Sequence, residues 1–202
     1  RASAELLQRW KLSRQRSDLD ARRVEYRLCW TDPDSGLEVR CVAVAYRDFP
    51  TVEWTVYFRN AGQSDTPLLE NIQSLDSRLG PGSDGEPVLH HFKGALAEPD
   101  DYRPRQTVLD PTASLRLTTS GGRPCNRDLP YFNLAWPDGG VIVAIGWPGQ
   151  WAATFAREGP AAVRGRAGQE LTRFKLHPGE EVRTPLIVLQ FWKGDRLESH
   201  NV

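Results

Sequence analysis

Apolar and polar residues alternate along much of the chain, which is the pattern of strands with one face in a core. The segment VEWTVYF is the clearest case, because Val52, Trp54, Val56 and Phe58 fall on one face and polar residues and a tyrosine fall on the other. The same pattern predicts strands over Val24–Trp30, Leu37–Tyr46, Val52–Phe58, Thr66–Ile72, Ser114–Thr119, Tyr131–Ala135, Gly140–Gly146, Trp151–Ala156, Glu170–Leu176 and Arg183–Phe191.

Turn sequences such as NAGQSD, PDGG, REGP and HPGE separate these segments. A short helix is predicted only near the start, in Ser3–Trp10. No Gly-rich loop follows a strand in the way that phosphate binding requires, and no fixed-period repeat is present. An all-β fold of two stacked antiparallel sheets, a β-sandwich with little helix, is therefore predicted.

Two stretches depart from this pattern. Between residues 76 and 111 only Val88–Phe92 reads as a strand, and loops of more than about 15 residues in compact domains tend to be binding or interface segments. The second stretch, SGGRPCNRDLPYF at Ser120–Phe132, places two glycines, two arginines and two prolines between strands. We expect function or a domain contact in these stretches, with exposed loops that bind nothing as the alternative.

Composition narrows the class of protein. A chain of 202 residues is long enough for one sandwich domain, and its 26 basic side chains balance its 26 acidic ones. We therefore expect no nucleic-acid partner, and no apolar run approaches the roughly 20 residues that a membrane span needs. A soluble chain is expected, in the cytoplasm or secreted. Because it has no methionine, its first residue reflects processing or a cut from a longer chain.

The three cysteines are predicted to be free thiols. Their number is odd and no CxxC spacing occurs. The turn TDPDSG implies a hairpin, and a register with Trp30 opposite Leu37 places Cys29 and Cys41 on opposite faces of the sheet. The third cysteine, Cys125, has no partner left.

The spacing of the histidines, carboxylates and serines matches no known catalytic or metal-binding motif. His90 and His91 are adjacent, so on a strand they point to opposite faces and cannot share a metal. His177 lies in a turn and His200 near the chain end. Neighbouring carboxylates occur only in turns, and no G-x-S-x-G motif is present. By itself the sequence predicts no catalytic residue, no metal site and no cofactor.

Two turns and the strands around them resemble a known family. HPGEEVRTP contains the order P-G-E-x-x-x-T-P, and PGQW has proline and glutamine where that family has serine and asparagine. With these turns, the stretches Gly36–Asp76, Gly139–Phe155 and Leu171–Asp195 resemble the N-terminal β-supersandwich domain of family 36 glycoside hydrolases, chiefly α-galactosidases. Turn chemistry alone explains both motifs equally well as scaffold.

The resemblance implies a galactose-mutarotase-like supersandwich. Residues 1–202 would form a single N-terminal domain, cut from a longer chain in which a (β/α)8 barrel with the catalytic aspartates follows. That parent would hydrolyse terminal α-galactosides with retention, whereas this chain alone would be inactive. The implied partners are the catalytic barrel of the same polypeptide, a galactoside substrate bound through the parent, and further copies in a homo-oligomer.

Within that resemblance, four residues are candidates for the rim of the sugar pocket or for a domain contact. They are Arg123, Asn126, Asp76 and Trp151. Arginine and asparagine supply donors and acceptors that suit sugar hydroxyls, and the two loop stretches are the segments expected to approach the barrel.

The alternative function is a free-standing carbohydrate-binding module. Trp136, Trp147 and Trp151 would then offer aromatic faces for sugar stacking. Against this, Trp136 and Trp147 belong to apolar strand sequence, which is typical of a core. Tight galactoside binding by the isolated chain would favour the module.

Overall fold

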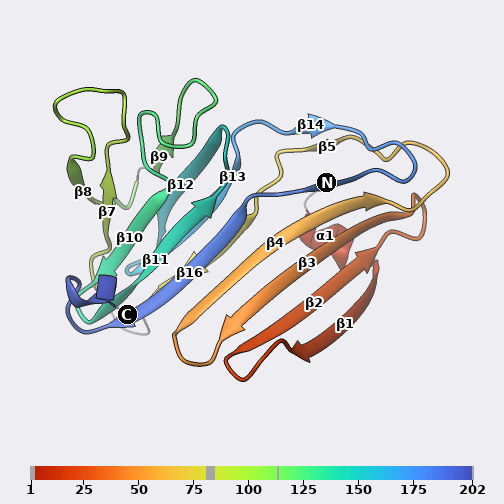
Figure 1. The fold of residues 1–202 in the computed structure, drawn as a ribbon, viewed down its shortest axis with the longest axis horizontal. Helices are drawn as coiled ribbons and strands as arrows, with labels where there is room; N and C mark the ends of the chain where they lie inside the picture. Colours follow the sequence, from red (N-terminus) through yellow and green to blue (C-terminus); the bar gives the residue numbers. More distant parts are fainter. Residues whose placement is uncertain (1–2, 81–84, 113, 202) are drawn as a thin grey trace.

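The computed structural model describes residues 3–80, 85–112 and 114–201, and Figure 1 shows that they form an antiparallel β structure. The elements in chain order are α1 (Ser3–Leu7), β1 (Lys11–Asp18), β2 (Arg23–Thr31), β3 (Leu37–Tyr46), β4 (Thr51–Asn60), β5 (Leu69–Glu70), β6 (Leu75–Leu79), β7 (Val88–Phe92), β8 (Pro104–Val108), β9 (Ser114–Thr118), β10 (Tyr131–Trp136), β11 (Gly139–Gly146), β12 (Trp151–Glu158), β13 (Ala162–Gln169), β14 (Arg173–Phe174), β15 (Glu181–Arg183), β16 (Leu186–Lys193) and the 3-10 helix η1 (Glu198–Asn201). The all-β prediction is confirmed. No helix in the described ranges has both the length and the apolar character that a membrane crossing requires.

The strands form a large sheet, a smaller sheet and a short ribbon. The large sheet has ten strands in the order β1-β2-β3-β4-β16-β11-β10-β7-β8, with β15 paired to β4. The smaller sheet has the order β6-β13-β12-β9, and β14 pairs with β5 in the ribbon. The core lies between the smaller sheet and the β16-β11-β10-β7 half of the large sheet, where Phe132 packs edge-on against Trp151 and Phe155. The sandwich prediction is therefore confirmed.

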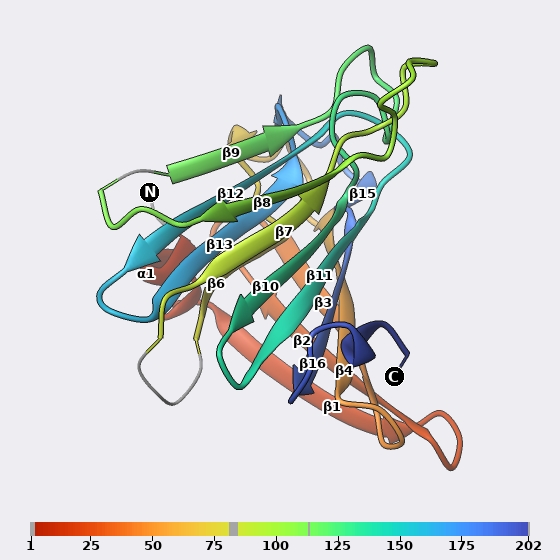
Figure 2. The same cartoon turned by 90° about the vertical axis from the view of Figure 1, so that its left-hand side faces the viewer.

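Strands β1 to β4 extend beyond the smaller sheet and lie far from β7, β8 and β9, as Figures 1 and 2 show. We call these four strands the wing. Register brings apolar residues of β2, β3 and β4 side by side, for example Trp30, Val39 and Phe58. We define the apolar wing face as Tyr26, Leu28, Trp30, Val39, Cys41, Ala43 and Val56. None of these residues is fully buried, although β3 has a neighbouring strand on both sides.

Four strands lie where the sequence predicted none, namely β1, β6, β8 and β13. Since β8 and all but the first residue of β6 fall between residues 76 and 111, the prediction of a single strand there is wrong. Residues 81–84 of that stretch lie outside the described residues. In β13, Val163, Gly165 and Ala167 face the core, and a Cβ on Gly165 would lie 3.3 Å from Leu79. These small residues fit beneath the facing strands but give a weak apolar signal.

Three predicted elements are shorter than expected. The helix ends at Leu7 rather than Trp10, and the predicted strands Thr66–Ile72 and Glu170–Leu176 contract to the two-residue strands β5 and β14. The predicted strand Arg183–Phe191 divides into β15 and β16 because Pro185 has no N–H for the ladder.

The register predicted for the first hairpin is wrong by two residues. Trp30 lies opposite Val39 rather than Leu37. Asp32 N donates to Leu37 O at 2.9 Å, so the turn is two residues shorter than expected. A shift of two leaves every side chain on the same face. Cys29 and Cys41 therefore point to opposite faces, and the prediction of three free cysteines is confirmed.

Candidate functional site

Two loops at one end of the sandwich are locked together and protrude beyond the sheets at the upper left of Figure 1. They are the β7–β8 loop, residues 93–103, and the β9–β10 loop, residues 119–130. Gly94 N donates to the carbonyl oxygen of Arg127 at 2.9 Å. A Cβ on Gly94 would lie 1.9 Å from the carbonyl oxygen of Cys125, so this contact requires glycine.

Charged groups fix the β7–β8 loop from within. The ammonium group of Lys93, which is 8% exposed, donates to the carboxylates of Asp100 and Glu98. These two bonds raise the pKa of Lys93. Asp101 accepts hydrogen bonds of 3.0 Å from the backbone N–H groups of Leu96 and Glu98, which lowers the pKa of its carboxyl group. The loop therefore keeps its shape through ionic and backbone contacts.

A buried carboxylate and a core indole hold the β9–β10 loop. Asp128 is 4% exposed and accepts hydrogen bonds from Thr118 N at 3.3 Å and from Arg105 Nη1 at 3.4 Å. The indole Nε1 of Trp151 donates to the carbonyl oxygen of Pro124 at 2.7 Å. Both contacts tie the loop to the sandwich core.

Backbone strain is concentrated in this pair of loops. Ala97, Tyr102 and Arg127 have φ values of 65°, 62° and 71°, and only one other non-glycine residue in the described ranges has a positive φ. Such angles cost roughly 1 kcal/mol or more per residue and persist where the surroundings enforce them. Tyr102 is 61% exposed and Leu96 is 46% exposed. The loops thus hold large side chains in water in a fixed arrangement.

The structure brings Arg123 and Asn126 together in the β9–β10 loop. Arg123 is exposed, Asn126 is half-buried, and neither side chain makes a hydrogen bond within the described part of the chain. Trp151 belongs to the same region but is 0% exposed. Its indole supports the loop from the core and offers no surface for a direct contact.

Asp76 does not join this group. It lies on β6, which β13 and β12 separate from β9, and it forms ion pairs with Arg164 at 2.5 Å and Arg166 at 3.1 Å. The hydrogen bond from Arg164 lowers the pKa of its carboxyl group. Asp76 thus belongs to an arginine-paired group on the outer face of the smaller sheet.

The tryptophans of the alternative function do not form an exposed platform. Trp136 and Trp151 are 7% and 0% exposed, and the Nε1 of Trp136 donates to the carbonyl oxygen of Ala161. Trp147 is half-buried against the core, and the guanidinium carbon of Arg183 lies 5.4 Å from the centre of its ring. The expectation of three stacking faces is wrong, because core packing buries the rings of Trp136 and Trp151.

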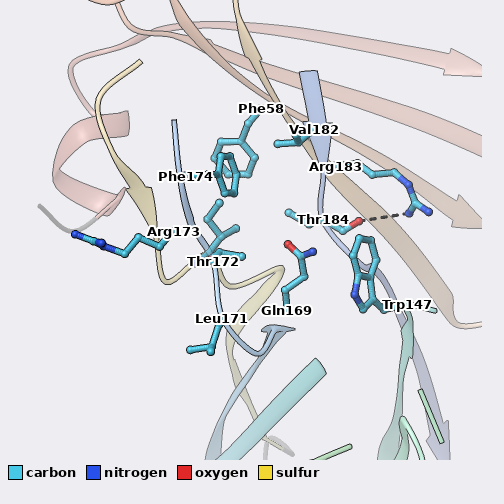
Figure 3. Close-up of a pocket in the computed structure, with 11 residues that line it drawn as sticks. Phe58, Trp147, Gln169, Leu171, Thr172, Arg173, Phe174, Val182, Arg183 and Thr184 are labelled. Carbon is cyan, nitrogen blue, oxygen red and sulfur yellow. Dashed lines mark hydrogen bonds between the residues drawn. The ribbon is translucent and has the colours of Figure 1, made fainter. Parts of the chain in front are cut away.

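Sequence reasoning missed a groove of about 530 Å³ between the large sheet, the ribbon and the end of β13 (Figure 3). It is lined by Phe58, Ile72, Trp147, Gln169, Leu171, Thr172, Arg173, Phe174, Val182, Arg183 and Thr184. These residues come from segments far apart in the chain, so no local motif could reveal the groove.

Most of the groove wall is apolar, but three polar side chains reach it with unused hydrogen-bonding capacity. The amide of Gln169 points into the groove and has no partner among the described residues. Thr172 Oγ1 accepts from Ile72 N at 2.8 Å, and its own hydrogen has no acceptor there either. Arg183 makes one long bond, of 3.5 Å, to the carbonyl oxygen of Thr184.

Histidines and carboxylates do not gather into a metal site in the ranges that the structure describes. His91 is 5% exposed, its Nε2 lies 3.1 Å from Thr107 Oγ1, and its Nδ1 is buried without a hydrogen-bond partner. Burial lowers the pKa of His91. His90 is half-buried and lies opposite Asn133 of β10.

The sequence matches no protein-family model and none of the curated proteins. Solved structures do match. An α-galactosidase from Lactobacillus brevis is 14% identical with a TM-score of 0.73, over 92% of this chain and 26% of that one. The GH36 α-galactosidase AgaA of Geobacillus stearothermophilus, in complex with raffinose, is 17% identical with a TM-score of 0.69, over 88% and 25%. The galactosidase domain of an α-galactosidase-sucrose kinase is 15% identical with a TM-score of 0.68, over 92% of this chain and 27% of that one.

This chain therefore has the fold of the N-terminal part of the GH36 α-galactosidases, and it spans about a quarter of the length of the matched chains. A galactose mutarotase related enzyme from Lactobacillus acidophilus is also similar, at 9% identity and a TM-score of 0.50, over 89% of this chain and 71% of that one. The predicted galactose-mutarotase-like fold class is confirmed.

Proposed function

We propose that this chain is the non-catalytic N-terminal domain of an α-galactosidase-like glycoside hydrolase. The parent hydrolyses terminal α-galactosides on a following (β/α)8 barrel, where two carboxylates perform the double displacement. The domain packs on that barrel and shapes its pocket or its oligomer. Support comes from the shared fold and from the lengths of the matched chains, of which this chain spans about a quarter.

The apolar wing face is the observation that carries this proposal. A sheet buries its apolar face against a second layer, and each Å² of apolar surface left in water costs about 25 cal/mol. Trp30, Leu28 and Val39 nevertheless remain only partly covered within the described residues. A partner that supplies the second layer would remove this cost, and the remaining part of a longer polypeptide is such a partner.

The opposite face of the wing carries charged residues, together with Val42 and Val44. Arg40 donates to Glu181 at 3.1 Å, and its guanidinium carbon lies 4.9 Å from the centre of the Tyr57 ring. Glu38 and Arg59 lie opposite each other on the same face. This asymmetry selects the apolar face as the docking side.

The interlocked loops are the second proposed contact. Arg123 and Asn126 carry donors and acceptors that are unused within the described residues, on a loop whose shape is fixed by Asp128 and Trp151. In the parent these two side chains touch the rim of the sugar pocket, in the same polypeptide or in a neighbouring copy. Asp76 contributes from its own face only as a domain contact, and Trp151 acts by positioning the loop.

Thiol labelling tests the docking of the wing, because Cys41 lies on its apolar face and Cys29 on the opposite face. Both are half-buried in this chain, and burial raises the pKa of both thiols. The labelling rate of each cysteine is measured by mass spectrometry with a maleimide, in residues 1–202 and in the polypeptide of the complete reading frame.

We expect Cys41 to become strongly protected in the longer polypeptide while Cys29 keeps its rate. Cys29 is the matched control, since it lies one strand away on the other face. Equal labelling of Cys41 in the two polypeptides would overturn the proposed docking side.

A further inference from the structure

The groove in Figure 3 has a lining that fits a specific class of ligand. Phe58 and Phe174 lie together at one end, Trp147 and Arg183 lie at another, and the Gln169 amide projects between them. Its volume of about 530 Å³ is within the range of small-molecule sites, roughly 300–1,000 Å³. We propose that this groove is a non-catalytic binding site for a neutral saccharide.

The unused polar groups argue for a ligand that carries both donors and acceptors. Gln169 offers one acceptor and two donors, and Thr172, which is 8% exposed, offers one donor. Arg183 is held over the Trp147 ring, which orders its guanidinium group and leaves most of its five N–H donors free. Hydroxyl groups can pair with all three side chains.

Other ligand classes fit less well. A purely apolar ligand would leave Gln169 and Thr172 desolvated without partners, which costs about 1–3 kcal/mol for each group. A strongly anionic ligand would call for converging cations, but the Arg173 side chain points out of the groove and lies 3.6 Å from Glu70. A sugar ring has apolar C–H faces for Phe58 and Phe174 and hydroxyls at its edges.

No residue of the loop that carries Arg123 and Asn126 lines the groove, and its aromatic walls are not the buried tryptophans Trp136 and Trp151. The choice of a saccharide as the ligand class is based on the residues that line the groove. The choice of an α-galactosyl sugar as the probe rests on the proposed function, because such sugars are the expected substrates of the parent.

The test is a titration of ¹⁵N-labelled residues 1–202 with raffinose, followed by NMR. We expect saturable shifts of the Gln169 side-chain amide and of the Trp147 indole N–H. Gln169→Met, which keeps the length of the side chain, should weaken binding roughly tenfold or more. Gln106→Met on the exposed strand β8 is the matched control and should bind as the unsubstituted chain does. Arg183→Gln is a second variant, which removes the guanidinium group without touching the core.

Absence of saturable shifts up to the solubility limit of raffinose would overturn the proposal. Shifts confined to the β9–β10 loop, or unchanged binding by both Gln169→Met and Arg183→Gln, would do the same. None of these results bears on Cys41 protection or on hydrolysis by the longer polypeptide, so failure of the groove is distinguishable from failure of the proposed function. Raffinose binding in the groove would favour a free-standing module only if the longer polypeptide also failed those two tests.

Discussion

The indole nitrogen of Trp151 donates a 2.7 Å hydrogen bond to the carbonyl oxygen of Pro124. Trp151 is 0% exposed and packs against Phe132 in the core, whereas Pro124 lies between Arg123 and Asn126 on the β9–β10 loop. A core residue therefore sets the shape of the loop that we propose as a contact surface.

Trp151→Phe should loosen that loop. Loss of the hydrogen bond and the cavity left by the smaller ring should lower the free energy of unfolding by about 2–4 kcal/mol in urea denaturation. Amide hydrogen exchange should also become faster in residues 121–127. Trp136→Phe is the matched control, because Trp136 makes a similar bond to Ala161 O. It should cost similar stability and leave exchange in 121–127 unchanged; equal exchange in both variants would refute the link.

Gly94→Ala should separate the two interlocked loops. The new Cβ would lie 1.9 Å from the carbonyl oxygen of Cys125, so the backbone must move, at a cost of roughly 2 kcal/mol or more. Thermal unfolding should show a lower Tm. Gly80→Ala serves as the control, since its Cβ would meet Ala162 at 3.4 Å and its φ is not positive. Equal Tm values for the two variants would contradict the close contact.

Stability should fall as the pH drops through the range of histidine. Burial lowers the pKa of His91, whereas the unfolded chain titrates near the ordinary value of about 6.5. Below that pH the unfolded chain binds a proton that folded His91 does not, so the free energy of unfolding decreases until the lowered pKa is reached. His91→Gln should reduce this slope in urea denaturation between about pH 7.5 and about pH 5.

His177 provides the control of opposite sign. Its hydrogen bond with Asp65, at 2.8 Å, raises the pKa of His177. The stability it contributes is present below the unfolded pKa and is lost as the pH rises through the folded pKa. His177→Gln should therefore make the loss of stability on acidification steeper. Burial also lowers the pKa of His90, so the His91→Gln variant should keep part of the pH dependence of its free energy of unfolding. If His91→Gln left that pH dependence unchanged, the buried neutral imidazole of His91 would be contradicted.

Replacement of Arg123 and Asn126 by alanine in the longer polypeptide should raise KM for an α-galactoside by roughly tenfold, equivalent to about 1.4 kcal/mol. Stability should not change, because neither side chain makes a hydrogen bond within the described residues. Arg78→Ala, at an exposed arginine on the outer face of the smaller sheet, is the control and should leave KM unchanged. Unaltered kinetics in the double variant would reduce the loop to a connector.

Period-2 alternation predicted the strands with large apolar residues, and Val52–Phe58 lies within β4 as expected. The same method failed for β13, where glycine and alanine face the core, and for the edge strand β1, where Leu12 is the one large apolar residue. Backbone pairing with β2 holds β1 in place, and that pairing leaves no trace in the hydrophobic pattern.

The candidate sites were harder to predict than the strands. Glycines and prolines indicated the β9–β10 loop, but its interlocking with Gly94 depends on a contact between residues about 30 positions apart. The groove joins Phe58, Trp147 and Gln169, which meet only after three separate segments have packed. Residue type alone suggested Trp151 and Asp76 as contact residues. The burial of Trp151 and the ion pairs of Asp76 depend on tertiary contacts that the local sequence does not specify.

Hydrolysis of an aryl α-galactoside shows whether catalysis needs more of the polypeptide than residues 1–202. Its rate is measured for residues 1–202 and for the polypeptide of the complete reading frame, under the same conditions. We predict turnover by the complete polypeptide and none by residues 1–202, because in the proposed parent the two catalytic carboxylates lie on the following barrel. Turnover by residues 1–202 alone, or an inactive complete polypeptide, would contradict the account.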